Sequence, residues 1–197
     1  MSGKQQGNED GFYGCFAAIR ASLDYSYHKL YNRERQLMQD DILRSFLAQG
    51  RRSTEQVAIF TAGPMGSGKT FVMDHLKRRG FLPAQDFVTV DPDALRECLP
   101  EYNALLNDDA LTAGSMTQEE AGLLAEILTH AALGCGMSVI VDGSLRNSTW
   151  YENHFSELRD RYANLWLSII FVTAPRGEIY RRVLVRLANF CSLCEHV

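Results

Sequence analysis

Several features that mark particular classes of protein are missing from this sequence of 197 residues. There is no basic excess, because the formal net charge is −4, and this removes the usual electrostatic signal for binding nucleic acid or an anionic membrane. No apolar run is long enough to cross a bilayer, since the longest one covers only residues 167–172. The polar start MSGKQQGNEDG has no signal-peptide core, so we expect a cytoplasmic protein with neither a membrane nor a nucleic-acid partner.

Cysteine is scarce and irregularly spaced. The five cysteines, at positions 15, 98, 135, 191 and 194, are odd in number and fit reduced thiols better than a disulfide framework. The string CSLC at 191–194, followed by His196, resembles half of a zinc site, but zinc normally takes four ligands and the sequence has no second such pair. We therefore predict no metal there, and we expect Cys98 and Cys135, which lie in apolar contexts, to be core thiols.

The length suits one domain with an N-terminal extension. Residues 1–11 are polar and predicted to be disordered, and an apolar stripe at helical spacing predicts a helix over 24–50 that ends at Gly50. That helix is either a docking segment for a protein partner or a helix packed on the sheet, and packing is favoured. The predicted division is an extension over 1–52, a main domain over 53–190 and an atypical tail over 191–197.

The main domain alternates between short apolar runs and amphipathic segments. The predicted strands cover 57–62, 87–90, 137–143 and 165–173, and the predicted helices cover 69–80, 117–134, 148–163 and 175–190. Thr117 followed by Glu120 fits a capping box, which sets the predicted start of its helix. This alternation predicts a three-layer α/β fold in which helices cover both faces of a mainly parallel sheet.

The string GPMGSGKT, from Gly63 to Thr70, matches the phosphate-binding pattern G-x-x-x-x-G-K-[ST]. Its glycines let the backbone turn with positive φ and bring N–H groups close to a phosphate, and the following helix presents its positive end to the same anion. A glycine-rich turn that matches by chance is the alternative, but a strand precedes the loop and a helix follows it. The predicted nucleotide-binding residues are Gly63, Pro64, Met65, Gly66, Ser67, Gly68, Lys69 and Thr70, with Lys69 on the phosphates and Thr70 on Mg²⁺.

Carboxylates follow two of the other predicted strands. Open α/β sheets bind ligands at the carboxyl ends of their strands, so these carboxylates are candidates to complete a phosphoryl-transfer site. Asp93 follows the strand 87–90 and is placed to accept a proton from a substrate hydroxyl, although either Asp91 or Asp93 would also serve as a helix cap. Asp142 ends the strand 137–143 and is placed to orient Mg²⁺, although its DG pair also fits a simple turn.

Taken together, GPMGSGKT, VDPDALRECLPEYNALL and VIVDGSLR resemble the zeta-toxin family of P-loop kinases over about residues 57–188. The loop is common to many nucleotide-binding proteins, whereas the D-x-D-x-x-R string is much more specific. Characterised bacterial toxins of the family phosphorylate the sugar of UDP-N-acetylglucosamine, and the likeness is closer to zeta-toxin-like domains of eukaryotic proteins. The resemblance implies ATP and Mg²⁺ as cofactors and a small-molecule hydroxyl as the acceptor.

The resemblance also assigns roles to individual residues. Asp93 corresponds to the catalytic aspartate, and Lys69 and Thr70 correspond to the loop lysine and the hydroxyl beside Mg²⁺. Asp142 stands where the toxins carry a longer glutamate. The other matched residues are Glu126 and Ser144 on the substrate side, where Ser144 replaces a threonine, and Arg146 and Arg186 facing the phosphates.

Two of these assignments have plainer alternatives. Glu126 also fits a solvated position on its helix, and Arg186 also fits a surface arginine of a basic helix. A second phosphate-clamping arginine of the family would fall beyond Val197, so the resemblance predicts a catalytic domain that is truncated or differently ended. Loss of such an arginine predicts poor turnover.

The sequence is therefore interpreted as an ATP-binding kinase that transfers the γ-phosphate to a hydroxyl of a small molecule, with a nucleotide sugar as one candidate. ATP is preferred over GTP by the resemblance, and no guanine-reading N-K-x-D string is present. Two alternatives stay open: a kinase for another acceptor, and a nucleotide-binding or protein-interaction module whose turnover is impaired.

Overall fold

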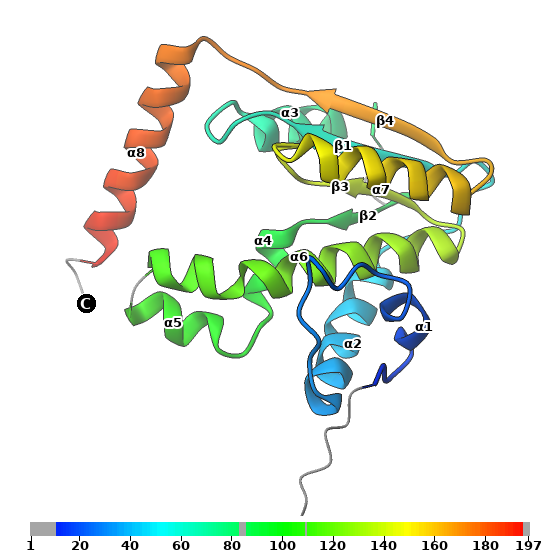
Figure 1. The fold of residues 1–197 in the computed structure, drawn as a ribbon. Helices are drawn as coiled ribbons and strands as arrows, with labels where there is room; N and C mark the ends of the chain where they lie inside the picture. Colours follow the sequence, from blue (N-terminus) through cyan, green and yellow to red (C-terminus); the bar gives the residue numbers. More distant parts are fainter. Residues whose placement is uncertain (1–10, 83–85, 109, 195–197) are drawn as a thin grey trace, which may run out of the picture.

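The computed structural model describes residues 11–82, 86–108 and 110–194, with side chains described outside 108–111 and 186–194. A parallel sheet of four strands runs through its centre, in the order β2-β3-β1-β4 (Figure 1). The strands are β1 (Val57–Ala62), β2 (Phe87–Val90), β3 (Ser138–Val141) and β4 (Trp166–Phe171). The predicted α/β fold with a mainly parallel sheet is confirmed.

The strand sequences explain this arrangement. β1 and β3 lie in the middle of the sheet, where Ile59 pairs with Ile140, and nearly all of their residues are buried, as expected for parallel strands covered on both faces. On one face, Ile59 and Ile140 pack with Met73 of the helix that follows the loop after β1. On the other face, the larger core cluster contains Leu158 together with alternate residues of these strands, namely Ala58, Phe60, Val139 and Val141.

Helices are found where the predicted amphipathic segments lie, with shifted ends. They are α1 (Ala17–Arg20), α2 (Arg33–Leu47), α3 (Lys69–Arg78), α4 (Pro92–Glu97), α5 (Tyr102–Asp108), α6 (Ala110–Gly134), α7 (Ser148–Arg161) and α8 (Arg176–Cys194). The larger core cluster is formed by α6 and α7 against the sheet, whereas α3 covers the opposite face (Figure 1). No helix in the described part of the chain is long and apolar enough to cross a membrane.

The predicted start of α6 is wrong. The helix begins at Ala110, so Thr117 lies inside it and donates its hydroxyl to the carbonyl oxygen of Ala113 at 2.7 Å. Glu120 does not return to a helix end either, because its carboxylate accepts hydrogen bonds from Arg35. The buried Ala113 shows the reason, since packing extends the helix beyond the start that a local capping pattern suggests.

Of the predicted helix over 24–50, only residues 33–47 form the helix α2. α2 begins at Arg33 because Asn32 accepts the backbone N–H of Arg35 at 2.9 Å, which is a typical N-cap. The helix packs against α6, and its Arg35 forms ion pairs with Glu120 of α6 and with Glu101, which precedes α5. The extension is therefore fixed to the domain by these charged groups and by apolar packing, since Leu43 of α2 lies in the larger core cluster with Val88 of β2. The favoured packing on the sheet is observed together with packing against α6.

Two expectations about cysteine are corrected or left open. Cys98 and Cys135 are exposed rather than core thiols, because each lies where a helix ends and the chain turns. α8 continues to Cys194, beyond the predicted end at residue 190, so part of the predicted tail is helical. His196 and the side chains of residues 191–194 lie outside the described part of the structure.

Candidate functional site

The loop between β1 and α3 has the backbone geometry of a phosphate cradle. Gly63, Gly66 and Gly68 have φ values of +135°, +82° and +98°, which favour glycine. A Cβ atom on Gly63 would lie 2.1 Å from the carbonyl oxygen of Val172, so no larger residue fits there. The loop therefore depends on glycine both for its turns and for its close passage beside the end of β4.

The loop carries polar groups that suit an anionic ligand. The hydroxyl oxygen of Ser67 is buried and has no hydrogen-bond partner within the described residues. The Nζ atom of Lys69 donates to the carbonyl oxygen of Gly63 at 3.0 Å, which folds the lysine back over the loop. Lys69 also begins α3, whose positive end points into the loop. An unpaired donor, a lysine and a helix N-terminus fit a phosphate group. Thr70 is exposed in the first turn of α3.

An arginine that the sequence interpretation missed lies against the loop. Nη1 of Arg182 donates long hydrogen bonds to the carbonyl oxygens of Gly66 and Ser67, at 3.3 and 3.4 Å. Its Nε atom donates to Glu178 at 2.7 Å, one turn earlier on α8. Residue counting selected Arg186 instead, and the side chain of Arg186 is outside the described set, so its role stays a prediction. The basic string YRRVLVR was the available signal, but it does not tell which arginine faces the loop.

Carboxylates end the two strands on one side of β1. Asp142 follows β3, and the hydroxyl of Thr61 on β1 donates to its carboxylate. The backbone N–H of Asp142 donates to Val90 at the end of β2, at 2.8 Å. The phosphate loop, Asp142 and the Asp91–Asp93 pair therefore follow the carboxyl ends of three adjacent strands. This is the edge at which α/β sheets bind their ligands.

The two aspartates at the start of α4, Asp91 and Asp93, have different roles. The side chain of Asp91 caps the helix by accepting the backbone N–H of Asp93 at 2.9 Å. Burial raises the pKa of Asp91, and the carboxylates of Asp142 and Asp93 raise it further. The side chain of Asp93 is 79% exposed. Its one ion pair within the described residues is with Arg96, at 3.2 Å. Asp91, and not Asp93, is therefore the N-cap of α4.

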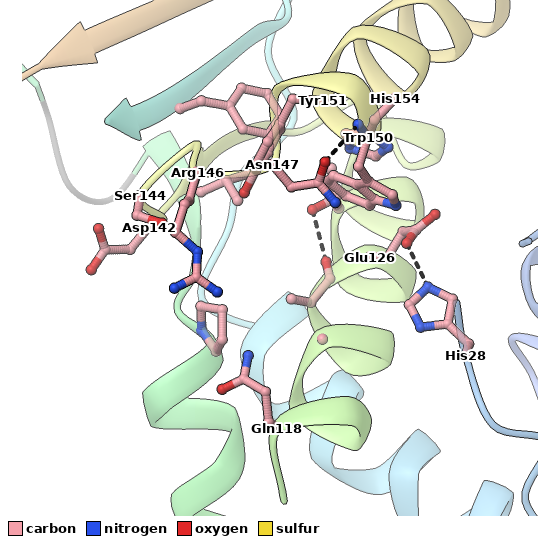
Figure 2. A pocket seen from close by; sticks show the side chains of 16 residues that line it. His28, Gln118, Glu126, Asp142, Ser144, Arg146, Asn147, Trp150, Tyr151 and His154 are labelled. Carbon is pink, nitrogen blue, oxygen red and sulfur yellow. Dashed lines mark hydrogen bonds and ion pairs between the residues drawn. The ribbon is translucent and has the colours of Figure 1, made fainter. Parts of the chain in front are cut away.

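A cavity of about 310 Å³ opens beside this edge (Figure 2). Four residues singled out in the sequence line it, namely Glu126, Asp142, Ser144 and Arg146. Asp93 and the phosphate loop are not among the lining residues, although Pro92 is. The aromatic wall of Trp150, Tyr151 and His154 comes from α7 and was missed, because helical periodicity alone does not separate cavity-lining from core positions.

Within this cavity, Glu126 is buried and not solvated. Its carboxylate lies 2.7 Å from Nε2 of His28, which comes from the irregular segment before α2 (Figure 2). The solvated alternative for Glu126 is therefore wrong, because the extension covers this position of α6. His28 was missed for the same reason, since no local pattern places a residue of the extension next to α6.

The loop that carries Ser144 and Arg146 is itself unusual. Leu145 between them has φ of +52°, the sole positive value among non-glycine residues in the described ranges. Leu145 packs against the core, so its side chain is held inward between two neighbours that line the cavity. A sparsely populated backbone conformation of this kind persists where surrounding contacts fix it, and such positions cluster at functional sites.

Comparisons with known proteins identify a family and a similar fold. The family model described as Zeta toxin matches residues 42–191. A solved structure from the characterisation of the PezAT chromosomal toxin–antitoxin system of Streptococcus pneumoniae has a similar fold, with a TM-score of 0.67 and 20% identity, over 83% of this chain and 66% of that chain. A search of curated protein sequences finds no match. The structural likeness establishes the fold, and the described chain spans under two thirds of the length of that relative.

Proposed function

The chain belongs to the zeta toxin family, and from this premise we propose that it is an ATP-dependent phosphotransferase acting on a hydroxyl group of a small molecule. The family and the fold are those of P-loop nucleotide-binding phosphotransferases. The observation that carries the proposal is the meeting of three features at one sheet edge. These are the phosphate loop, the carboxylates that end β2 and β3, and a cavity that Asp142 lines.

The donor nucleotide would be held by the loop after β1. Backbone N–H groups of the loop, the unpaired hydroxyl of Ser67 and the ammonium of Lys69 are the donors available to the phosphates. Lys69 would exchange its bond to the Gly63 carbonyl for one to a phosphate oxygen. Bound ATP would supply the phosphoryl group, and Mg²⁺ would neutralise charge on it. The hydroxyl of Thr70 and the carboxylate of Asp142 would hold the Mg²⁺.

The acceptor would be held in the cavity of about 310 Å³. Its wall combines charged side chains, Glu126 and Arg146, with the aromatic rings of Trp150 and Tyr151. Such a lining suits a polar molecule that also has flat faces, and a nucleotide sugar has both properties. In this proposal Ser144 donates or accepts at a sugar hydroxyl, and Arg146 faces a phosphate of the acceptor or of the donor.

Asp93 is proposed as the group that accepts the proton of the acceptor hydroxyl. It is the member of the aspartate pair that is not used as a cap, and it stays exposed at the edge where the ligands would meet. Asp142 is held by Thr61 and would orient Mg²⁺ or its water. Arg182, and Arg186 as predicted from the resemblance, would stabilise charge that develops on the transferred group.

The direct experiment is to incubate the protein with ATP, Mg²⁺ and a panel of nucleotide sugars and simple sugars, and to detect phosphorylated products by mass. We expect one acceptor to gain a phosphate, and we expect Lys69→Ala to abolish nucleotide binding. Absence of product with every acceptor, while wild-type protein binds ATP and Lys69→Ala does not, would overturn phosphotransfer and leave a nucleotide-binding module. In that case the exposed stripe of α2 around Leu37 becomes the candidate contact for a protein partner.

A further inference from the structure

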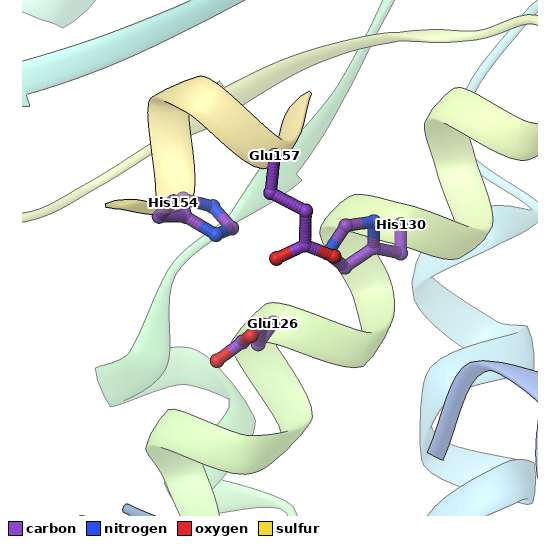
Figure 3. Close-up of side chains that lie close together, drawn as sticks. All are labelled: Glu126, His130, His154 and Glu157. Carbon is purple, nitrogen blue, oxygen red and sulfur yellow. The ribbon is translucent and has the colours of Figure 1, made fainter. Parts of the chain in front are cut away.

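Four side chains that can bind metal converge between α6 and α7 (Figure 3). Glu126 and His130 are four residues apart on α6, and His154 and Glu157 are three residues apart on α7. Residues at these spacings share one face of a helix. One candidate ligand atom of each residue lies within 4.8 Å of those of the other three.

Two imidazole nitrogens in this cluster are buried without a hydrogen-bond partner in the described chain. They are Nε2 of His130 and Nδ1 of His154, and the two residues are only 1% and 5% exposed. The nearest anionic atom to Nε2 of His130 is Oε1 of Glu157 at 3.7 Å, which is too long for a hydrogen bond. Buried polar atoms normally have a hydrogen-bond partner. Two buried nitrogens without one therefore point to a bound ligand from outside the protein.

The surroundings of His130 direct a lone pair into the cluster. The hydroxyl of Tyr162 donates to the backbone carbonyl of His130 at 3.0 Å, so its oxygen is left to accept from Nδ1, which lies 3.2 Å away. With the proton on Nδ1, the other nitrogen Nε2 carries the free lone pair. A hydrogen bond from the second ring nitrogen is the usual way in which proteins orient a metal-binding histidine.

We propose that Glu126, His130, His154 and Glu157 bind a divalent transition-metal ion, with Zn²⁺ the best fit to the ligand set. Two imidazole nitrogens and two carboxylate oxygens are a suitable tetrahedral set for zinc, whereas Ca²⁺ and Mg²⁺ favour sites made of oxygen alone. Zinc bonds of about 2 Å bring ligand atoms closer than 4.8 Å, so small side-chain rotations close the site.

Two cavities adjoin the proposed metal site. A second cavity, of about 180 Å³, is lined by Glu126, His154 and Glu157, so solvent reaches the cluster from the side of the extension. Glu126 and His154 also line the larger cavity. The ion would therefore tie α6 to α7 in the wall between the cavities and draw Glu126 away from His28. Metal binding here does not depend on the proposed phosphotransfer.

The test uses the full chain, stripped with a chelator and titrated with Zn²⁺, and with Co²⁺ as a spectroscopic probe. We expect one ion per chain, visible bands of tetrahedral Co²⁺ without thiolate charge transfer, and a higher melting temperature with metal. Glu157→Gln and His154→Gln should each weaken binding by at least about tenfold, the scale on which zinc sites respond to altered coordination. His75→Gln, an exposed histidine of α3, is the matched control and should bind normally.

The cysteines near the C-terminus provide the competing explanation, so Cys191→Ser/Cys194→Ser is included. Glu157 is half-exposed, so its Gln variant is expected to fold even if a histidine variant does not, and circular dichroism checks this. The proposal is overturned if the wild type binds no metal. It is equally overturned if Glu157→Gln keeps full affinity, or if the serine variant loses binding together with a thiolate charge-transfer band.

Discussion

Asp91 accepts a hydrogen bond from the backbone N–H of Asp93 at 2.9 Å, so the first aspartate is committed to the helix cap and the second is not. This relationship predicts different outcomes for the same substitution at the two positions. Asp93→Asn should abolish phosphoryl transfer with little effect on folding, because its side chain is exposed. Asp91→Ala should lower the free energy of unfolding by roughly 1 kcal/mol, which is the usual cost of losing an N-cap.

Product formation and denaturant unfolding, measured on both variants, check this prediction. Asp91→Asn is the matched control, because asparagine also caps helices and should leave stability nearly unchanged. Full turnover in Asp93→Asn would remove that residue as the proposed proton acceptor.

The hydroxyl of Thr61 orients Asp142, and Thr61→Val removes the donor while keeping the shape of the side chain. Thr61 is fully buried, so water does not replace the lost bond. We expect turnover to fall by roughly 10- to 100-fold, the range found when a partner that orients a metal ligand is removed. Steady-state kinetics at varied Mg²⁺ concentration measure the change, which should be partly rescued by excess Mg²⁺.

Thr117→Val is the control for this substitution. Thr117 is also buried, but its hydroxyl donates its hydrogen bond to the carbonyl of Ala113 within the same helix and not to a carboxylate of the site. The same loss of turnover in both variants would mean that Thr61 acts only through stability.

The parts of this fold set by local patterns were predictable from the sequence. The phosphate loop and β1 lie where expected, because glycine spacing and an apolar run are local signals. Asp142, Glu126, Ser144 and Arg146 meet in one cavity, although only the family resemblance brought them together beforehand. The predicted start of α6 was wrong, because contacts between residues distant in sequence decide where this helix begins.

Contacts between distant segments account for what the sequence did not reveal. His28 reaches Glu126 across 98 positions of the chain, and Arg182 reaches Gly66 across 116. Neither contact leaves a periodic trace, because a single polar residue pairs with a single distant partner. The buried polar face of α2 was missed for the same reason, although the expected apolar stripe is packed as well, with Leu43 in the larger core cluster.

The buried ion pair between Arg20 and Asp40 predicts that the extension unfolds readily when one partner is lost. The two charges lie 2.6 Å apart, and both side chains are 1% exposed. Arg20→Met would leave the Asp40 carboxylate buried without its cation, at a cost of roughly 3–5 kcal/mol. Thermal unfolding should show a much lower melting temperature, with loss of the His28 contact at the cavity.

Arg44→Met provides the control, because Arg44 pairs with Asp41 on the exposed side of α2 at 2.8 Å. Exposed pairs of this kind contribute about 0–1 kcal/mol, so this variant should unfold almost as the wild type does. Similar melting temperatures for both variants would mean that the Arg20 pair adds nothing to the fold.

Gly66 lies where the phosphate loop passes close to α8, so we predict that a side chain at this position disturbs the contact. A Cβ atom there would lie 3.0 Å from the carbonyl oxygen of Ile179 and from Val183, and φ is +82°. Gly80 has a similar φ of +76° with open space around it, so Gly80→Ala carries only the backbone strain. Gly66→Ala should therefore lower the free energy of unfolding by roughly 1 kcal/mol more than Gly80→Ala, and it alone should weaken nucleotide binding. Equal effects would exclude a crowded contact with α8.

Glu178 accepts hydrogen bonds from both Arg181 and Arg182. Variants of the two arginines therefore separate the effect of the charge on Glu178 from the effect of contact with the loop. Hydrogen bonds from Arg181 and then Arg182 lower the pKa of Glu178 to about 2. A carboxyl whose pKa is lowered in the folded state stabilises the fold above the unfolded pKa, and that contribution is lost as the pH falls toward 2. Arg181→Ala and Arg182→Ala should each raise the pKa, as measured by NMR titration of the Glu178 carboxyl carbon at low ionic strength.

Only one of these two variants is expected to affect the nucleotide. Arg182 contacts the loop at Gly66 and Ser67, whereas Arg181 points to solvent and serves as its matched control. Calorimetric titration with ATP should give weaker binding for Arg182→Ala and unchanged binding for Arg181→Ala. Because both variants disturb the same carboxylate, a loss of affinity shared equally between them would assign the effect to Glu178 and remove Arg182 from the phosphate site.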